Sequence, residues 1–65
     1  MRMAERIKKG SRIAYNDGRP GHQHVEAAVL EVDRRGMTVQ FDDRADTTRI
    51  LFSDRKWMDF IAVLR

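Results

Sequence analysis

Five basic residues have the types and spacing best suited to binding phosphate. Arg34 and Arg35 stand together in the turn DRRG, between two apolar runs, while Arg19, Lys8 and Lys9 lie upstream. A guanidinium group can meet a phosphate with two parallel hydrogen bonds, and a tight turn would hold both arginines with little further ordering. These five residues predict a nucleic-acid-binding surface to which the two arginines contribute more than the two lysines.

An ordinary surface of mixed charge is the alternative for the same residues. Acidic side chains lie close to them in the sequence: Asp17, Asp33, Asp42 and Asp43. Carboxylates among the cations would weaken the attraction for a polyanion. The residue pattern leaves both interpretations open.

Tyr15 and Trp57 are the candidates for a protein-interaction surface. Trp57 stands in the polar segment DRKWMD, beside Arg55 and Lys56. An exposed indole next to two cations could stack on a base or on a protein partner. The alternative is structural, because a chain with few large side chains can use a tryptophan to close the open end of its core.

The chain offers no convincing catalytic or metal-binding constellation. His22 and His24 have no serine or cysteine nucleophile in a recognisable context, and two histidines are too few for a structural metal. Asp42, Asp43 and Asp46 share one turn but lack the spacing of a calcium loop. We therefore expect a non-enzymatic protein with no cofactor and no small-molecule substrate.

Length and composition predict one small domain that packing alone must stabilise. The 65 residues contain no cysteine, and 13 Lys and Arg face 10 Asp and Glu, a net charge of +3. So short a chain can bury only a small core, and no disulfide can support it. No apolar run approaches the length of a membrane span, and no apolar stretch follows the basic start. We expect a soluble, cytoplasmic protein without a membrane partner.

Residues 1–9, MRMAERIKK, are predicted to form a basic N-terminal arm. Met3, Ala4 and Ile7 have helical spacing, but a helix of two turns is marginal in water. We expect a mobile arm whose deletion leaves the fold intact, with residues 10–65 forming the single folded domain.

Residues 27–43 predict the β-hairpin on which the rest of the fold depends. Met37, Val39 and Phe41 alternate with polar residues and are expected to face the core. Upstream, Val32 joins the face of Ala27 and Val29 only if a β-bulge inserts one residue near Leu30 and Glu31. In the turn, Asp33 is expected to accept backbone hydrogen bonds and Gly36 to adopt a positive φ, which suits a loop of three or four residues.

The remaining segments predict three more strands and one helical turn. Strands are expected at residues 11–16, 47–52 and 59–64, since each alternates or is rich in β-branched and aromatic residues. Residues 16–24 contain Asp-Gly and Pro-Gly pairs and form the longest loop. Residues 53–58 open with Ser53 and Asp54 as possible N-caps of a single helical turn. Phe52 and Phe60 are expected in the core.

Five short strands with one helical turn before the last predict an all-β, SH3-like small barrel. The chain from about Gly10 to Leu64 also resembles the Tudor family, and KOW-type domains share the same architecture. The positions that carry this resemblance are Gly10, Asp17, Gly18, Ala27, Val29, Val32, Val39, Phe41, Asp43, Ser53 and Asp54.

The resemblance implies a binding module but not the aromatic cage with which Tudor domains hold methylated cations. Arg44 stands where that family commonly has an aromatic residue, and only Tyr15 and Phe41 could supply cage walls. We expect a module that binds nucleic acid or a nucleoprotein complex through Arg34, Arg35, Arg19 and the arm. The alternative is a protein-interaction module that uses the end with Tyr15 and Trp57, or a homodimer formed through an edge strand.

Overall fold

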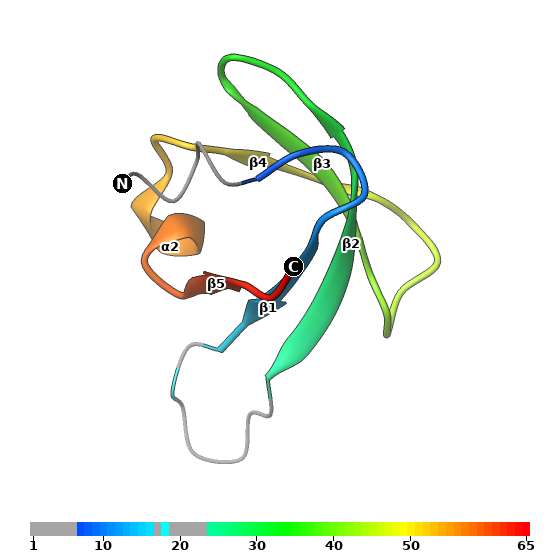
Figure 1. Ribbon diagram of the computed structural model, residues 1–65. Coiled ribbons are helices and arrows are strands. Elements are labelled where there is room, and N and C mark those ends of the chain that lie inside the picture. The colour runs from blue at the N-terminus through cyan, green and yellow to red at the C-terminus, as the bar shows by residue number, and fades with distance from the viewer. Residues whose placement is uncertain (1–6, 17, 19–23) are drawn as a thin grey trace.

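The computed structural model describes residues 7–16, 18 and 24–65, which form one antiparallel sheet and one short helix (Figure 1). The strands are β1 (Arg12–Tyr15), β2 (Val25–Val32), β3 (Gly36–Phe41), β4 (Thr48–Leu51) and β5 (Ile61–Val63). The helix α2 (Arg55–Met58) precedes β5. Their order in the sheet is β4-β3-β2-β1-β5, so every neighbouring pair except β1 and β5 is consecutive along the chain.

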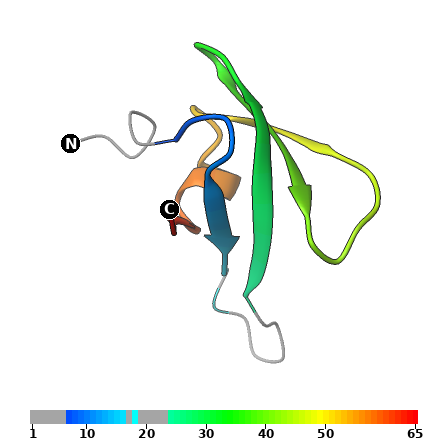
Figure 2. The same cartoon turned by 45° about the vertical axis from the view of Figure 1, so that its right-hand side comes forward.

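The sheet curls around a small core, which confirms the predicted all-β, five-stranded barrel. Both ribbon views place α2 and β5 on the side of the molecule opposite the loop that joins β3 to β4 (Figures 1 and 2). The side chains of the core are Ile7, Ile13, Ala27, Val29, Met37, Val39, Phe41, Ile50 and Ile61. Nearly all of them are aliphatic, so the core depends on dense packing of branched side chains.

Strand β3 supplies the centre of the core with the alternation that its sequence predicts. Met37 and Val39 are fully buried and Phe41 is 4 % exposed, while Thr38 and Gln40 on the opposite face are half-buried. A slip of one residue against either neighbour would reverse these faces, so the hydrophobic pattern fixes the register.

The predicted bulge is present in β2. Val29 lies opposite Val39, whereas Glu31 lies opposite Thr38, so one extra residue is inserted between them. The bulge bends β2 and returns Val32 to the face that packs against the core. Beyond it, only three residues separate the end of β2 from the start of β3, which agrees with the short loop expected from the sequence.

Gly36 has a different role from the one expected. Among the described residues only Gly10 and Gly18 have a positive φ, so the turn does not close through a left-handed Gly36. A Cβ at Gly36 would instead collide with the backbone oxygen of Ile50 and lie 2.9 Å from the Cα of Leu51. The missing side chain therefore lets β4 approach the start of β3 closely.

The helical turn begins where the sequence predicts. Asp54 is the N-cap of α2, and its carboxylate accepts a hydrogen bond of 3.0 Å from the backbone N–H of Lys56. A carboxylate at this position satisfies a donor that the helix leaves free. The cap starts the turn that carries Trp57 and Met58 against the core.

The folded part of the chain begins before Gly10. Ile7 is 5 % exposed and belongs to the core, and the backbone N–H of Lys8 donates to the hydroxyl of Ser11. Gly10, with φ of 92°, turns the chain, and its N–H donates to the carbonyl oxygen of Val29. Ile7, Lys8 and Lys9 therefore adjoin the folded domain, although the sequence assigned them to the arm.

Ile7→Ala is expected to lower the free energy of unfolding by about 2 kcal/mol. This value is at the lower end of the range for aliphatic core truncations, because the segment before β1 can shift and partly fill the cavity that the substitution leaves. Chemical denaturation measures the loss. Lys8→Ala is the control, since that side chain is exposed. Equal stability of the two variants would show that Ile7 does not anchor the segment.

Phe60 does not belong to the core, contrary to expectation. It is 42 % exposed and immediately precedes β5, with its ring edge-on to that of Tyr15 at a centroid distance of 6.1 Å. Strand β5 is only three residues long and alternates around the buried Ile61, so the neighbouring side chain points outward. Phe52, the other expected core residue, is half-buried and packs against the core from outside.

Candidate nucleic-acid interface

The turn between β2 and β3 is held in one shape by Asp33. Its Oδ1 accepts hydrogen bonds from the backbone N–H groups of Arg35, at 2.8 Å, and Gly36, at 3.0 Å. The N–H of Asp33 donates to the carbonyl oxygen of Gly36 at 2.9 Å. This arrangement confirms the predicted role of Asp33. It also fixes the backbone conformation from which the side chains of Arg34 and Arg35 extend.

Arg49 neutralises the carboxylate that holds the turn. Its Nη2 lies 2.8 Å from Oδ1 and 2.7 Å from Oδ2 of Asp33. The N–H of Arg35 and then Arg49 stabilise the charged carboxylate, so the pKa of Asp33 lies below its ordinary value. With the charge of Asp33 offset in this way, the charges of Arg34 and Arg35 are left to act outward.

An open hollow of about 460 Å³ lies beside the turn, and its lining residues are here called the tip site: Arg34, Arg35, Leu51, Phe52 and Ser53. The hollow lies where β3 and β4 approach each other closely at Gly36. Leu51 lies opposite Gly36 in the sheet, and the N–H of Phe52 donates to the carbonyl oxygen of Arg35 at 2.8 Å. Because Gly36 has no side chain, the end of β4 passes close to the turn and brings apolar side chains beside the arginines.

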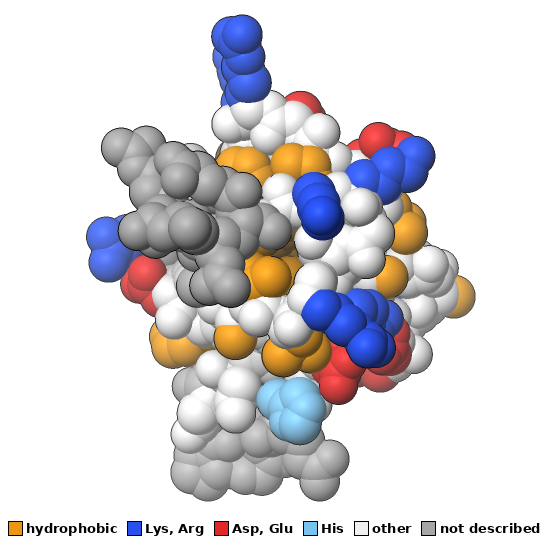
Figure 3. Space-filling model, in the orientation of Figure 1, with side chains coloured by type: hydrophobic (Ala, Val, Ile, Leu, Met, Phe, Trp, Pro, Cys, Tyr) orange, Lys and Arg blue, Asp and Glu red, His pale blue; other side chains and the backbone are white. Residues whose placement is uncertain are grey.

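The tip site combines cations with exposed apolar surface. Arg34, Arg35 and Ser53 are exposed, Leu51 is 43 % exposed and Phe52 is half-buried. Figure 3 shows Lys and Arg atoms projecting beyond the end of the β2–β3 hairpin, with hydrophobic side chains below them on the same face. Within the described part of the chain, neither Arg34 nor Arg35 forms an ion pair with a carboxylate.

Lys8 and Lys9, two of the other three predicted basic residues, do not line this hollow. Lys9 forms an ion pair of 3.5 Å with Glu31, beside the bulge of β2, and both side chains are largely exposed. Lys8 is exposed on the same segment before β1. Arg19 lies outside the described residues. The structure therefore brings together Arg34 and Arg35, and the proximity of Lys8, Lys9 and Arg19 to them stays a prediction.

Tyr15 and Trp57 meet at the other candidate surface. Their ring centroids are 5.1 Å apart, and Trp57 also stacks on Phe41 at 5.8 Å with 26° between the ring planes. Both side chains are half-buried and pack against the core, as in the structural alternative for Trp57. On the outside, the guanidinium carbon of Arg44 lies 5.9 Å from the centre of the Phe41 ring.

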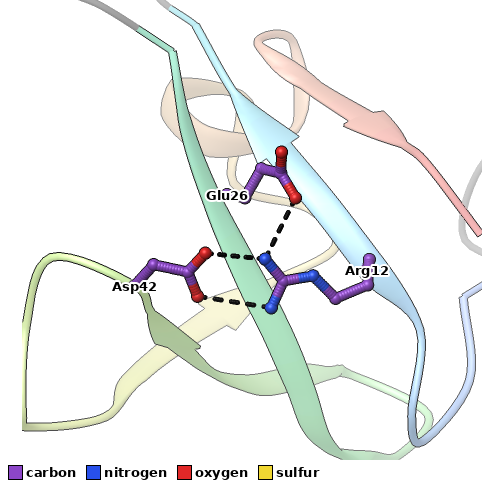
Figure 4. A network of polar contacts seen from close by, with 3 residues as sticks. All are labelled: Arg12, Glu26 and Asp42. Atoms are coloured by element: carbon purple, nitrogen blue, oxygen red, sulfur yellow. Dashed lines mark hydrogen bonds and ion pairs between the residues drawn. The ribbon is translucent and has the colours of Figure 1, made fainter.

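A salt-bridge network joins β1 and β2 to Asp42, the residue that follows β3 (Figure 4). Arg12 of β1 donates to both carboxylate oxygens of Asp42, at 3.2 and 2.7 Å, and to Glu26 of β2 at 3.0 Å. These bonds raise the pKa of Arg12, with Asp42 the larger cause, and the bond from Arg12 lowers the pKa of Asp42. Arg12 therefore offsets the charge of Asp42, one of the carboxylates expected to weaken the attraction for a polyanion.

Acid should destabilise the fold through Asp33 and Asp42. The folded-state pKa of each lies below its ordinary value, so the unfolded chain takes up protons first as the pH falls. Their contribution is fully present above about pH 4, near the unfolded pKa, and is lost as the pH falls through the folded pKa. We expect the melting temperature, followed by circular dichroism, to decrease below about pH 4.

The double substitution Asp33→Asn and Asp42→Asn tests this assignment. It should lower the melting temperature at neutral pH and flatten its decrease between about pH 4 and pH 2. Asp43→Asn is the control, because the contact of Asp43 with Arg44 is 4.0 Å long. If the double variant kept the full pH dependence, other groups would be responsible for it.

Two further observations concern metal binding and membrane-spanning helices. Nowhere among the described residues do three His, Asp or Glu side chains gather in a way that could hold a metal ion. In the same part of the chain, no helix has the length and apolarity needed to cross a membrane.

Sequence reasoning missed three members of the tip site: Leu51, Phe52 and Ser53. The sequence predicted a core position for Phe52 because the chain has few large side chains with which to build a core. Its position beside Arg35 depends on the register of β4 against β3, which alternation within either strand does not determine. The one local signal in the sequence that could have placed Phe52 beside the turn is a glycine, Gly36, followed by an aromatic residue at the end of the next strand, and this signal is weak.

No protein-family model, curated protein or solved structure matches this chain.

Proposed function

We propose that this chain is a non-enzymatic nucleic-acid-binding module that contacts phosphate groups through Arg34 and Arg35. The observation that carries the proposal is the pairing of Asp33 with Arg49, which fixes the turn and offsets its one carboxylate. The two arginines therefore extend from a stiff hairpin end whose neighbouring acid is already neutralised. Guanidinium groups so placed can each bind a phosphate with two hydrogen bonds.

The basic residues elsewhere support a weaker, non-specific contribution. Lys8 and Lys9 precede β1, and the charge of Lys9 is partly offset by Glu31. Phosphate contacts of this kind fix position but carry no information on sequence. We therefore propose binding to nucleic acid or to a nucleoprotein complex without marked sequence preference. The architecture suits a Tudor-like or KOW-like barrel, and that assignment is part of the proposal.

An amide-shift titration with short single- and double-stranded oligonucleotides at low salt tests this function. Shifts should be largest at Arg34, Arg35 and the end of β4. Shifts confined to the surface around Tyr15, Trp57 and Phe60 would instead point to the other surface, and no shift at all would remove the proposal.

A protein-interaction surface at the aromatic end is the second candidate. The observation in its favour is the exposure of Phe60, 42 %, directly beside Tyr15. Aromatic side chains that remain partly exposed are enriched in protein interfaces. The two candidates differ in their response to salt, because nucleic-acid affinity falls steeply as salt rises and an aromatic protein contact changes little.

A further inference from the structure

We infer that the tip site takes a single-stranded nucleic-acid segment, with an unpaired base on Phe52 and Leu51 and its flanking phosphates on Arg34 and Arg35. This inference rests on the proposed function and goes beyond it in naming the form of nucleic acid. The juxtaposition that carries it is a hollow of about 460 Å³ with apolar side chains and two guanidinium groups in one lining.

The chemistry of the lining separates a single strand from a duplex. A duplex presents phosphates and sugars outward and keeps the faces of its bases stacked, so it has nothing apolar to offer Leu51 and Phe52. An unpaired base has a free π-face, and aromatic side chains bind such faces with little regard to sequence. Leu51 and Phe52 give the hollow an apolar lining that phosphate contacts do not use.

The two kinds of contact come from neighbouring positions of the backbone. The N–H of Phe52 is bonded to the carbonyl oxygen of Arg35, so the backbone of β4 and that of the turn are joined at this point. One short segment of nucleic acid could therefore supply both a base to Phe52 and a phosphate to Arg35. Ser53, exposed at the edge of the hollow, adds a hydroxyl that can donate to a second phosphate or to a sugar.

The proposal is tested by fluorescence anisotropy with an eight-nucleotide single strand, as DNA and as RNA, and with the corresponding duplex, at low salt. The single strands should bind more tightly than the duplex. Phe52→Leu, which keeps an apolar side chain and removes the ring, should weaken single-strand binding by about 5- to 150-fold without altering its salt dependence. Weakening of both the DNA and the RNA strand by Phe52→Leu supports the inference, because both offer the same free base faces to the ring.

Phe60→Leu is the matched control, because Phe60 is the other partly exposed phenylalanine outside the core and lies beside Tyr15. It should leave binding unchanged. Circular dichroism of both variants establishes that each still folds. If Phe52→Leu does not fold, the NMR signals of the Phe52 ring protons in the intact protein replace it: shifts of these signals on addition of single strand support the inference, and their absence overturns it.

Two kinds of failure are distinguishable. Tighter binding of the duplex, or single-strand binding that depends on Arg34 and Arg35 but not on Phe52, overturns the inference and leaves the proposed function in place. Absence of binding to every oligonucleotide overturns both. Binding of an acidic polymer such as polyglutamate as tightly as the single strand also overturns the inference, because it would show that charge alone is recognised.

Discussion

Phe41→Ala is expected to lower the free energy of unfolding by about 3–5 kcal/mol, the range for removing a buried aromatic ring. Phe41 is 4 % exposed, and its ring stacks on Trp57 at 5.8 Å, so truncation would leave a cavity and remove a packing partner of Trp57 as well. A domain of 65 residues has little stability to lose, and the variant is expected to be largely unfolded at 25 °C. Circular dichroism and chemical denaturation measure the effect.

Phe60→Ala provides the control for Phe41→Ala within the same chain. The same atoms are removed, but from a side chain that is 42 % exposed, so the loss should be at most about half as large. If Phe41→Ala kept the melting temperature of the parent protein, the core described here would be incorrect.

Replacing Arg34 and Arg35 together with alanine is expected to weaken oligonucleotide binding by about 50- to 100-fold at 50 mM salt. Each arginine that neutralises one phosphate releases condensed counterions, and at this salt concentration the release is worth about a factor of ten per phosphate. The fold should persist, because both side chains are exposed and the turn is held by Asp33. Anisotropy titrations measure the change in affinity.

A second double variant with the same change in net charge distinguishes the contribution of Arg34 and Arg35 from that of overall electrostatic attraction. Arg44 and Arg65 are also exposed, and neither lines the hollow at the hairpin end. Replacing both with alanine removes the same net charge and should weaken binding far less. Equal losses in the two double variants would mean that net charge, and not the hairpin tip, governs binding.

Features that depend on local pattern could be predicted from the sequence. The faces of Met37 and Val39 follow from strict alternation, and the bulge follows from the phase error between Val29 and Val32. The bonds that Asp33 accepts in its turn and the Asp54 cap depend on the preference of short acidic side chains for nearby backbone N–H groups.

Features that depend on how distant segments meet could not be predicted. Ile7 looked like part of a detached arm because helical spacing gives no sign that its side chain joins the core. Gly36 suggested a left-handed turn, whereas its actual partner is the backbone of Ile50, 14 positions away in the sequence. Phe60 is exposed because it neighbours the buried Ile61 at the start of β5 and therefore points outward.

The candidate site follows the same division. Arg34 and Arg35 could be placed at the end of a hairpin, since the turn residues define it. The hollow beside them depends on the register of β4 and on the ion pair between Asp33 and Arg49, neither of which the sequence pattern determines. The sequence therefore predicted the cations of the site, Arg34 and Arg35, but not its apolar lining, Leu51 and Phe52.

The central claim is that Arg34 and Arg35 contact phosphate, and its most direct test is the slope of log affinity against log salt concentration for a single-stranded oligonucleotide. The parent protein and the Arg34→Ala/Arg35→Ala variant are measured over the same salt range. If each arginine neutralises one phosphate, the slope should become shallower by about 1.4 in the variant. Two parallel lines would contradict the claim, because they would show that the arginines displace no counterions from the nucleic acid.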